Sequence, residues 1–510
     1  MSQNDFFHLL PLLILTLATL VIMLIIAVRR NHRIIYGVTV LAQAGAFASL
    51  FWLRSVTHYL IRPLFVIDGF ALLYLGLILL TSLVISVLSY TYFEQREERK
   101  EEYYILLILS TLGACVLVIS QHFVGLFLGL EILSVSLYGL IAYLRTRERS
   151  DEAGVKYLIL AAFSSAFLLF GMALVYASTG TMAFAGLAEF LANVPKLPVL
   201  LLTGLGMMII GVGFKLGVVP FHMWTPDVYE GAPAPVTAFI ATVSKGGMLA
   251  LLIRFFSQAD GYRYPALVLI FTVIAIASMF AGNLLALRQQ NVKRILAYSS
   301  IAHLGYLLVA FLAGDQLGVE AVTFYLAAYF ITSVGAFGVI VVLSDSERDA
   351  ELLSDYRGLL WRRPWIAAIF TAMLLSLAGI PLTAGFVGKF YVLAAGINSQ
   401  LWLPVVILVV NSVIGLYYYI QIIAVMFQQP ETETASEPQP ILAHPVYLTS
   451  MGTMVGLALL LILLGVYPTG LVQIIRGTLG TSATISAHQK PRADKPPYYQ
   501  KLAVESGKSK

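Results

Sequence analysis

Five ionisable side chains lie within long apolar runs: Glu131, Lys215, Lys245, His303 and Lys389. A lysine near the centre of a bilayer costs roughly 2.5–3.5 kcal/mol on insertion scales, so a charge at that depth usually serves a function. Amines, carboxylates and imidazoles can each bind and release a proton. A row of these groups therefore predicts the movement of ions, protons above all, across a membrane.

Glu131 needs a partner, because an isolated buried carboxylate would stay protonated. Ser134 and Tyr138 follow it at i+3 and i+7, so the three side chains share one face of a helix. Lys215 is the best candidate for the partner.

Helix-breaking residues accompany two of the lysines. Pro220 follows Lys215, and glycines crowd the stretch 211–217. Lys389 follows a second glycine- and proline-containing stretch, 379–385. Interrupted helices survive in a membrane only where they face a cavity or other protein, which is typical of ion and substrate sites in transporters.

Each residue also has a purely structural interpretation. The three lysines could brace broken helices by donating to freed carbonyls, Glu131 could be a structural ion-pair partner, and His303 could be a hydrogen-bonded core residue.

Four polar residues lie near the predicted helix ends. We expect Lys156 and Lys293 to be orientation charges that extend to the membrane surface. Asp227 should fix the turn that follows Pro220, and His222 could admit protons or simply pack at the interface.

Composition predicts an all-α polytopic membrane protein. The 510 residues are 59% hydrophobic and 12% charged, with a mean hydropathy of +0.86, whereas soluble domains carry about 25% charged residues. The net charge of +5 comes mostly from loops and the tail, so nucleic acid is not expected as a partner. A single cysteine, Cys115, excludes internal disulfides and cysteine-ligated clusters. No Rossmann fingerprint is present, so we expect no cofactor and no metal in this chain.

Apolar runs of about 20 residues predict fourteen spans, the first of them a retained helix. They lie near 7–28, 34–53, 70–91, 103–121, 123–144, 155–177, 198–219, 233–256, 264–287, 292–313, 319–344, 365–395, 402–428 and 447–472. The glycines and proline of 379–385 break the twelfth.

Arginine and lysine gather in alternate loops, which predicts that those loops are cytoplasmic and that both termini lie on the opposite side. The basic loops are those near 29–33, 96–100, 145–156, 288–294 and 348–363.

A shift of about 168 residues aligns one part of the chain with another. It pairs Glu152 with Glu320, Tyr138 with Tyr306, Tyr157 with Tyr325, Ser165 with Ser333, and Glu131 with Ser299. Because the unit holds five spans, consecutive units should be inverted in the membrane, as in many transporters. The predicted divisions are a three-helix segment (1–100), a first repeat (101–258), a second repeat (259–428), a linker with the last span (429–480) and a polar flexible tail (481–510).

The stretches 213–245, 291–306 and 377–393 closely resemble the antiporter-like membrane subunits of respiratory complex I, the proton-pumping NADH:quinone oxidoreductase. The similarity runs from about Leu9 to Pro468. Among the paralogous branches the chain is most similar to that of subunit N. It lacks the long lateral helix of the subunit L branch and has Lys389 where the subunit M branch is expected to have glutamate.

The resemblance implies fourteen helices in two inverted repeats, pairing of Glu131 with Lys215, a relay at Lys245 and terminal proton transfer at Lys389. It also implies membership of a translocase in a bacterial inner membrane with both termini periplasmic. The partners would be the other membrane subunits of that complex and lipid, and subunits elsewhere in the complex would carry FMN and iron–sulfur clusters and use quinone.

Two alternatives stay open: a subunit of a multi-subunit cation/proton antiporter, which shares this fold, and a structural membrane scaffold. Buried lysines argue against the scaffold, because it would gain nothing from their cost.

Overall fold

The computed structural model describes residues 3–54, 58–94, 96, 99–194, 197–429 and 445–479. Most of the predicted linker and the whole tail from 481 lie outside these residues.

The described chain is almost entirely helical, because a backbone in lipid must satisfy its polar groups within each segment. The helices of the first half are α1 (Gln3–His8), α2 (Leu10–Val28), α3 (His32–Trp52), α4 (Gly69–Glu94), α5 (Glu101–Ile119), α6 (Phe123–Ile141), α7 (Glu148–Thr179), α8 (Phe184–Asn193), α9 (Val199–Leu216), α10 (Trp224–Gly231), α11 (Ala234–Phe239), the π-helix η1 (Ile240–Ser244), α12 (Lys245–Gln258) and the 3₁₀ turn η2 (Gly261–Arg263). Those of the second half are α13 (Pro265–Ala286), α14 (Val292–Ala313), α15 (Gln316–Leu343), the 3₁₀ turn η3 (Leu353–Tyr356), α16 (Leu359–Arg362), α17 (Pro364–Ala378), α18 (Ala384–Asn398), α19 (Trp402–Phe427), α20 (Pro445–Val466) and α21 (Thr469–Leu479).

The predicted all-α polytopic fold is confirmed. Thirteen helices within the described residues are long and apolar enough to cross a membrane. The predicted twelfth span is the broken pair α17–α18, whose two halves are separated at Gly379. Together they account for the fourteen expected spans.

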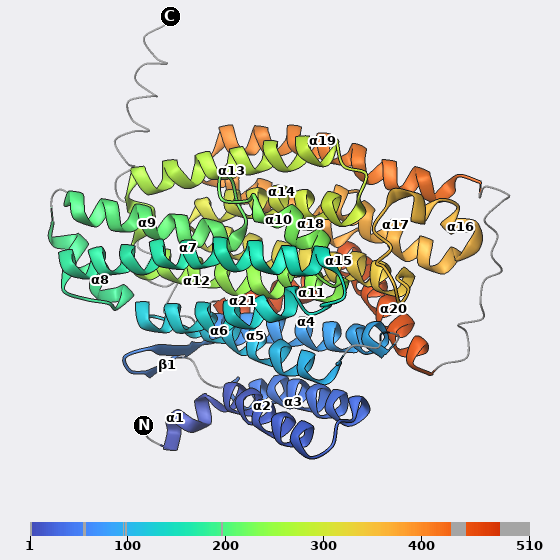
Figure 1. Cartoon of the computed structure of the whole chain (residues 1–510). Coiled ribbons are helices and arrows are strands. Elements are labelled where there is room, and N and C mark those ends of the chain that lie inside the picture. The colour runs from blue at the N-terminus through green and yellow to red at the C-terminus, as the bar shows by residue number, and fades with distance from the viewer. Residues whose placement is uncertain are drawn as a thin grey trace, which may run out of the picture.

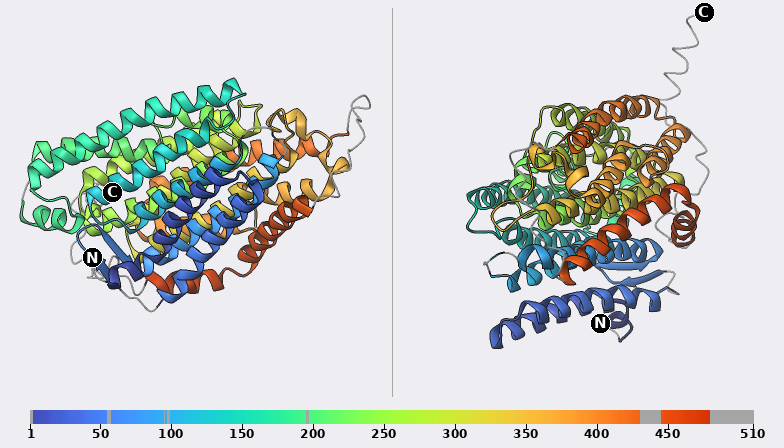
Figure 2. Two further views of the ribbon diagram at one scale, coloured as in Figure 1. Left: turned by 60° about the horizontal axis from the view of Figure 1, so that its bottom comes forward. Right: turned by 90° about the vertical axis from the view of Figure 1, so that its right-hand side faces the viewer.

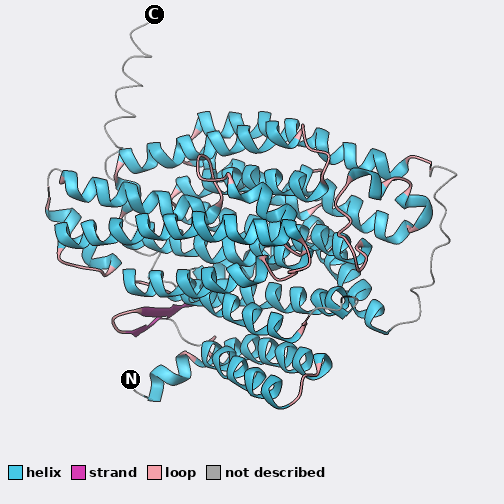
Figure 3. Ribbon diagram, viewed as in Figure 1, coloured by secondary structure: helices cyan, strands magenta, loops and turns pink. Residues whose placement is uncertain are grey.

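Several boundaries differ from the prediction. The seventh span ends at Leu216, before Pro220, because Gly217 adopts a left-handed conformation (φ 70°) that stops the helix. The last span ends at Val466 because Pro468 cannot continue it, and α21 forms separately. The prediction also missed α8 and an antiparallel hairpin of β1 (His58–Ile61) and β2 (Phe65–Asp68) (Figure 3).

The long helices run side by side, with the hairpin and α8 at one end of the bundle and α16 at the other (Figure 1). The N-terminal pair α2–α3 lies at one edge and α13 with α19 at the opposite edge, as the turned views also show (Figure 2). Helices α12 and α14 lie inside, with most of their residues buried. Lys245 and His303 are therefore placed in the centre of the bundle.

Candidate functional site

Lys215 lies in the last turn of α9 and is buried, with 3% of its surface exposed. Its ammonium donates to Ser134 Oγ at 3.0 Å and to the Tyr157 hydroxyl at 2.9 Å. The break beside it is closed by another residue, since Trp224 Nε1 donates to the Phe214 carbonyl at 2.9 Å. Lys215 is therefore held by side-chain hydroxyls and does not brace the broken helix.

Glu131 lies on α6, one turn before Ser134, and is only partly buried. Its carboxylate accepts a hydrogen bond of 2.7 Å from Ser165 Oγ. The described chain holds no direct ion pair between Glu131 and Lys215, because each is turned to a different hydroxyl. Ser134 contacts Lys215 from the helix that carries Glu131, so a proton can pass between the two charged groups only through other groups.

Lys245 is the first residue of α12, directly after the π-helix Ile240–Ser244. Its ammonium donates to Ser300 Oγ at 2.6 Å. The same serine oxygen lies 2.8 Å from the Tyr329 hydroxyl and 3.3 Å from that of Tyr229. Lys245 thus lies beside a cluster of three hydroxyls from three helices. The π-helix before it is a second indication, because π-helical turns frequently mark functional sites.

His303 of α14 is buried between two tyrosines. Nδ1 lies 2.7 Å from the Tyr325 hydroxyl and Nε2 lies 3.1 Å from that of Tyr419. Tyr419 also hydrogen-bonds to Ser299. A neutral imidazole has one donor and one acceptor nitrogen, so this chain of groups can reverse its hydrogen-bond direction by exchanging tautomers.

Lys389 lies in the second turn of α18 and is buried. It donates to the carbonyls of Leu377 and Ala378 at 3.0 and 2.9 Å, and to Ser412 Oγ at 2.9 Å. The two carbonyls are the last of α17, which the break leaves without helical partners. Its ammonium also lies 5.3 Å from the centre of the Tyr306 ring.

The five predicted residues all carry polar partners, but they do not form one cluster. Within the described residues no hydrogen bond or ion pair joins two members of the row, and each member contacts at least one hydroxyl. Tyr306, whose ring lies near Lys389, accepts a hydrogen bond of 3.0 Å from Asn283 Nδ2, and Asn283 Oδ1 accepts one of 3.0 Å from the Tyr418 hydroxyl. The described residues contain no group of three histidine, cysteine, aspartate or glutamate side chains that could hold a metal ion.

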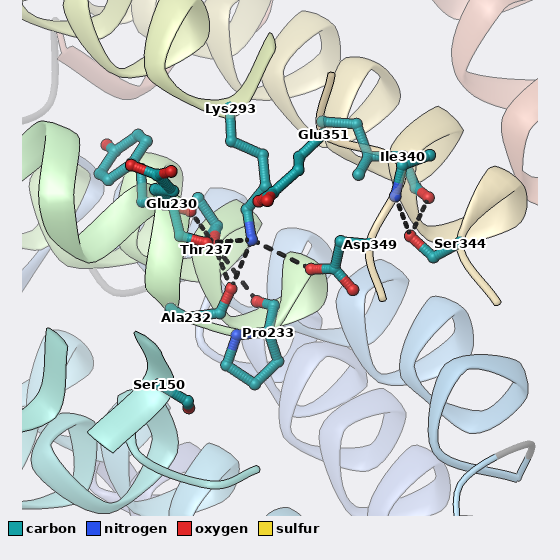
Figure 4. A network of polar contacts seen from close by, with 12 residues as sticks. Ser150, Glu230, Ala232, Pro233, Thr237, Lys293, Ile340, Ser344, Asp349 and Glu351 are labelled. Atoms are coloured by element: carbon teal, nitrogen blue, oxygen red, sulfur yellow. Dashed lines mark hydrogen bonds and ion pairs between the residues drawn. The ribbon is translucent and has the colours of Figure 1, made fainter. Parts of the chain in front are cut away.

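A buried charge cluster lies at the arginine-rich end of the bundle, in the loop after α15 (Figure 4). Asp349 forms ion pairs with Lys293 at 3.0 Å, Arg147 at 3.1 Å and Arg96 at 3.4 Å. Tyr92 donates to the same carboxylate at 2.7 Å. Burial alone would raise the pKa of Asp349, but the three cations and this hydrogen bond hold it well below its usual range.

Lys293 corrects one expectation. It is 1% exposed and does not extend to the membrane surface, because it also donates to the carbonyls of Glu230 and Ala232 at 2.8 and 2.6 Å (Figure 4). Lys156 is half-exposed as expected, but it pairs with Asp227 at 3.0 Å. Asp227 also pairs with Arg294 at 2.9 Å and so ties α10 to α7 and α14.

Sequence reasoning missed a second buried pair at the opposite end. Asp68 and Arg254 are fully buried, with Nη2 2.9 Å from Oδ1 and Nη1 3.1 Å from Oδ2. Arg254 Nε also donates to the Val118 carbonyl at 3.0 Å. Asp68 ends β2, so this pair joins the hairpin to α5 and α12. Asp68 could have been identified from the sequence, because it directly precedes a long apolar run and a buried charge at that position needs a partner.

Known proteins are similar to this chain in sequence and in fold. Residues 120–415 match the family model described as NADH:quinone oxidoreductase/Mrp antiporter, transmembrane. A protein of Ectopseudomonas mendocina named NADH-quinone oxidoreductase subunit N is 48% identical over 481 residues, which are 92% of this chain and 95% of that protein.

Solved structures share the fold. A chain of respiratory complex I from Thermus thermophilus with bound aureothin has a TM-score of 0.77 at 30% identity, covering 91% of this chain and 98% of that one. A chain of the archaeal membrane-bound sulfane sulfur reductase has a TM-score of 0.82 at 26% identity, covering 94% and 98%. A chain of the Mrp complex from Dietzia has a TM-score of 0.82 at 21% identity, covering 95% and 100%, which shows the fold alone.

Proposed function

The chain belongs to the NADH:quinone oxidoreductase/Mrp antiporter transmembrane family, and on that premise we propose that it is the proton-translocating membrane subunit N of an NADH:quinone oxidoreductase. The observation that carries the proposal is the row of three buried lysines, each hydrogen-bonded to a hydroxyl that can pass a proton on. Its 48% identity to a subunit N favours this role over a place in a cation/proton antiporter.

Protons would move along the row by successive transfers. Glu131 and Lys215 form its first part, Lys245 the centre, His303 the onward relay and Lys389 the end. Hydroxyls such as Ser134 and Ser300 each contact a lysine, so they suit the transfers between the charged groups. Water would complete the gaps, as it does in other polar interiors.

Other subunits must supply the energy. Moving one charge across a membrane costs about 2.3 kcal/mol per 100 mV. Within the proposal, NADH oxidation and quinone reduction take place on partner subunits that carry FMN and iron–sulfur clusters, and this chain contributes no redox centre. It would contact the other antiporter-like and small membrane subunits.

The proposal includes the predicted division of the chain and its orientation. Residues 101–258 and 259–428 would be inverted repeats, each with one broken helix. The cluster around Asp349 would face the cytoplasm of a bacterium, and both termini would face the periplasm.

Extraction in a mild detergent tests the assignment. NADH:quinone oxidoreductase activity should co-purify with this chain, and vesicles that contain the complex should acidify when NADH is supplied. Co-purification with antiporter subunits alone, without quinone reduction, would identify the antiporter alternative.

A further inference from the structure

Side chains from α10 and α12 converge on Gly217, two residues after Lys215. Gly217 caps α9 at φ 70°, and a methyl group added to it would lie 2.7 Å from Thr225 Oγ1, 3.5 Å from Lys245 Nζ and 3.5 Å from the Trp224 ring. Three elements therefore meet over a residue that has no side chain. Trp224 also packs against Tyr157, the partner of Lys215, with ring centres 5.0 Å apart.

The Thr225 hydroxyl lies directly over Gly217. Thr225 lies in the first turn of α10 and is fully buried. Its Oγ1 has no hydrogen-bond partner within the described residues. An unpaired buried hydroxyl is destabilising, so its position calls for an explanation.

The distances allow one bridging molecule. Because Oγ1 and Nζ lie 2.7 and 3.5 Å from the same point, they are at most about 6 Å apart. They are not hydrogen-bonded to each other. A single water that makes two hydrogen bonds of about 2.8 Å spans this gap.

We propose that Thr225 is a positioning residue for a proton relay between Lys215 and Lys245, and that its hydroxyl binds a water that also contacts Lys245 Nζ over the face of Gly217. The proposal rests on the proposed proton-translocating function and adds a named group to it. The water accepts the proton that the Lys215 ammonium releases through further waters and donates a proton to the neutral amine of Lys245, with Thr225 holding it in line.

Paired substitutions test the role in the assembled complex. Thr225→Val keeps the shape and removes the hydroxyl, and Thr225→Ser keeps the hydroxyl. Thr39→Val is the matched control, because the Thr39 hydroxyl is equally buried but lies on α3 and donates to the Ile35 carbonyl of the same helix at 2.9 Å. We expect Thr225→Val to slow proton pumping into vesicles about three- to tenfold, Thr225→Ser to restore it, and Thr39→Val to match the wild type.

Lys215→Ala serves as the reference for the function itself. Loss of pumping in Lys215→Ala with normal pumping in Thr225→Val would overturn the relay and leave the proposed function intact. Normal pumping in both would overturn both. A map of the complex that resolves internal waters gives a second readout: the expected water touches Thr225 Oγ1 and Lys245 Nζ, and its absence beside other ordered waters also overturns the relay.

Discussion

Lys215 precedes its break in the chain, whereas Lys389 follows its own. The first lysine donates to two hydroxyls, and the second donates to two backbone carbonyls and one hydroxyl. A hydroxyl can donate or accept, but a carbonyl only accepts. The hydroxyl site therefore suits both forms of its lysine, and the carbonyl site favours the ammonium form.

The second site gains further from its helix. The C-terminal end of α17 carries partial negative charge, which stabilises a nearby cation. Lys389 therefore stabilises the end of α17 in addition to any role in proton transfer. At the first break, Trp224 and not Lys215 bonds to the free carbonyl. Two lysines with similar glycine- and proline-rich surroundings in sequence are held by different chemistry, so equal substitutions should have unequal effects.

The largest effect is expected at the hydroxyl site. Lys215→Ala should lower proton pumping on the order of 100-fold, because a positioned acid–base group contributes about that much. The complex should still assemble, since Lys215 does not close the helix break. Pumping and quinone reduction are measured in vesicles at equal assembly, and unchanged pumping per electron would show that Lys215 is not part of the path.

A substitution at Lys389 separates its two roles. The amide of Lys389→Gln can still donate to the carbonyls of Leu377 and Ala378, but it cannot carry a proton. We expect near-normal assembly with pumping reduced at least about tenfold. Lys389→Arg should behave likewise, because a guanidinium does not deprotonate. Wild-type pumping in either variant would identify Lys389 as a brace alone.

A milder change removes one partner of Lys215. Tyr157→Phe should slow pumping about three- to tenfold, because one hydrogen bond is lost and Ser134 remains. Tyr74→Phe is the control, since its equally buried hydroxyl bonds to Thr323, away from the lysines. The same loss in both variants would point to general destabilisation rather than to the lysine site.

The smallest effect concerns pH. Asp349 has a folded-state pKa below the value of about 3.9 expected for the unfolded chain. Its stabilising contribution is therefore complete above that value and is lost only as pH falls toward the folded pKa. The melting-temperature difference between wild type and Asp349→Asn should stay constant from pH 5 to 8. If this difference stays constant, Asp349 does not titrate in that range. Any pH dependence of pumping that differs between Lys215 and Lys389 variants would then arise at the two lysine sites. A difference that shrinks within this range would contradict the assignment of the ion pairs to Asp349.

The sequence predicted the features that depend on the free-energy cost of placing a charge or a helix break at a given position. A charge within an apolar run has to be buried with partners, and the glycine- and proline-rich stretches 211–220 and 379–385 hold the breaks, although the stop at Gly217 itself was not predicted. Partner choice was not predictable, because it depends on how helices rotate and slide against each other. Tyr157 and Tyr325 were aligned as repeat equivalents, but nothing in the chain indicated that one would bind Lys215 and the other His303.

The same limit applies to Asp68 and Arg254, which are 186 residues apart in the chain and meet through tertiary packing. Arg254 lies near the end of the predicted span 233–256, yet it is fully buried.

The π-helix before Lys245 makes the length of this segment as important as its composition. Ile240–Ser244 carries a wider turn than the α-helices on either side. Deleting one residue there would allow an uninterrupted α-helix and could even raise its local stability. Because a π-turn accommodates one residue more than an α-turn, this deletion would leave Lys245 facing Ser300, whereas one added residue would rotate Lys245 by about 100° relative to α11. A one-codon insertion in 240–244 should therefore leave a folded membrane protein that has lost its central relay, and a one-codon deletion in the same segment should spare the relay.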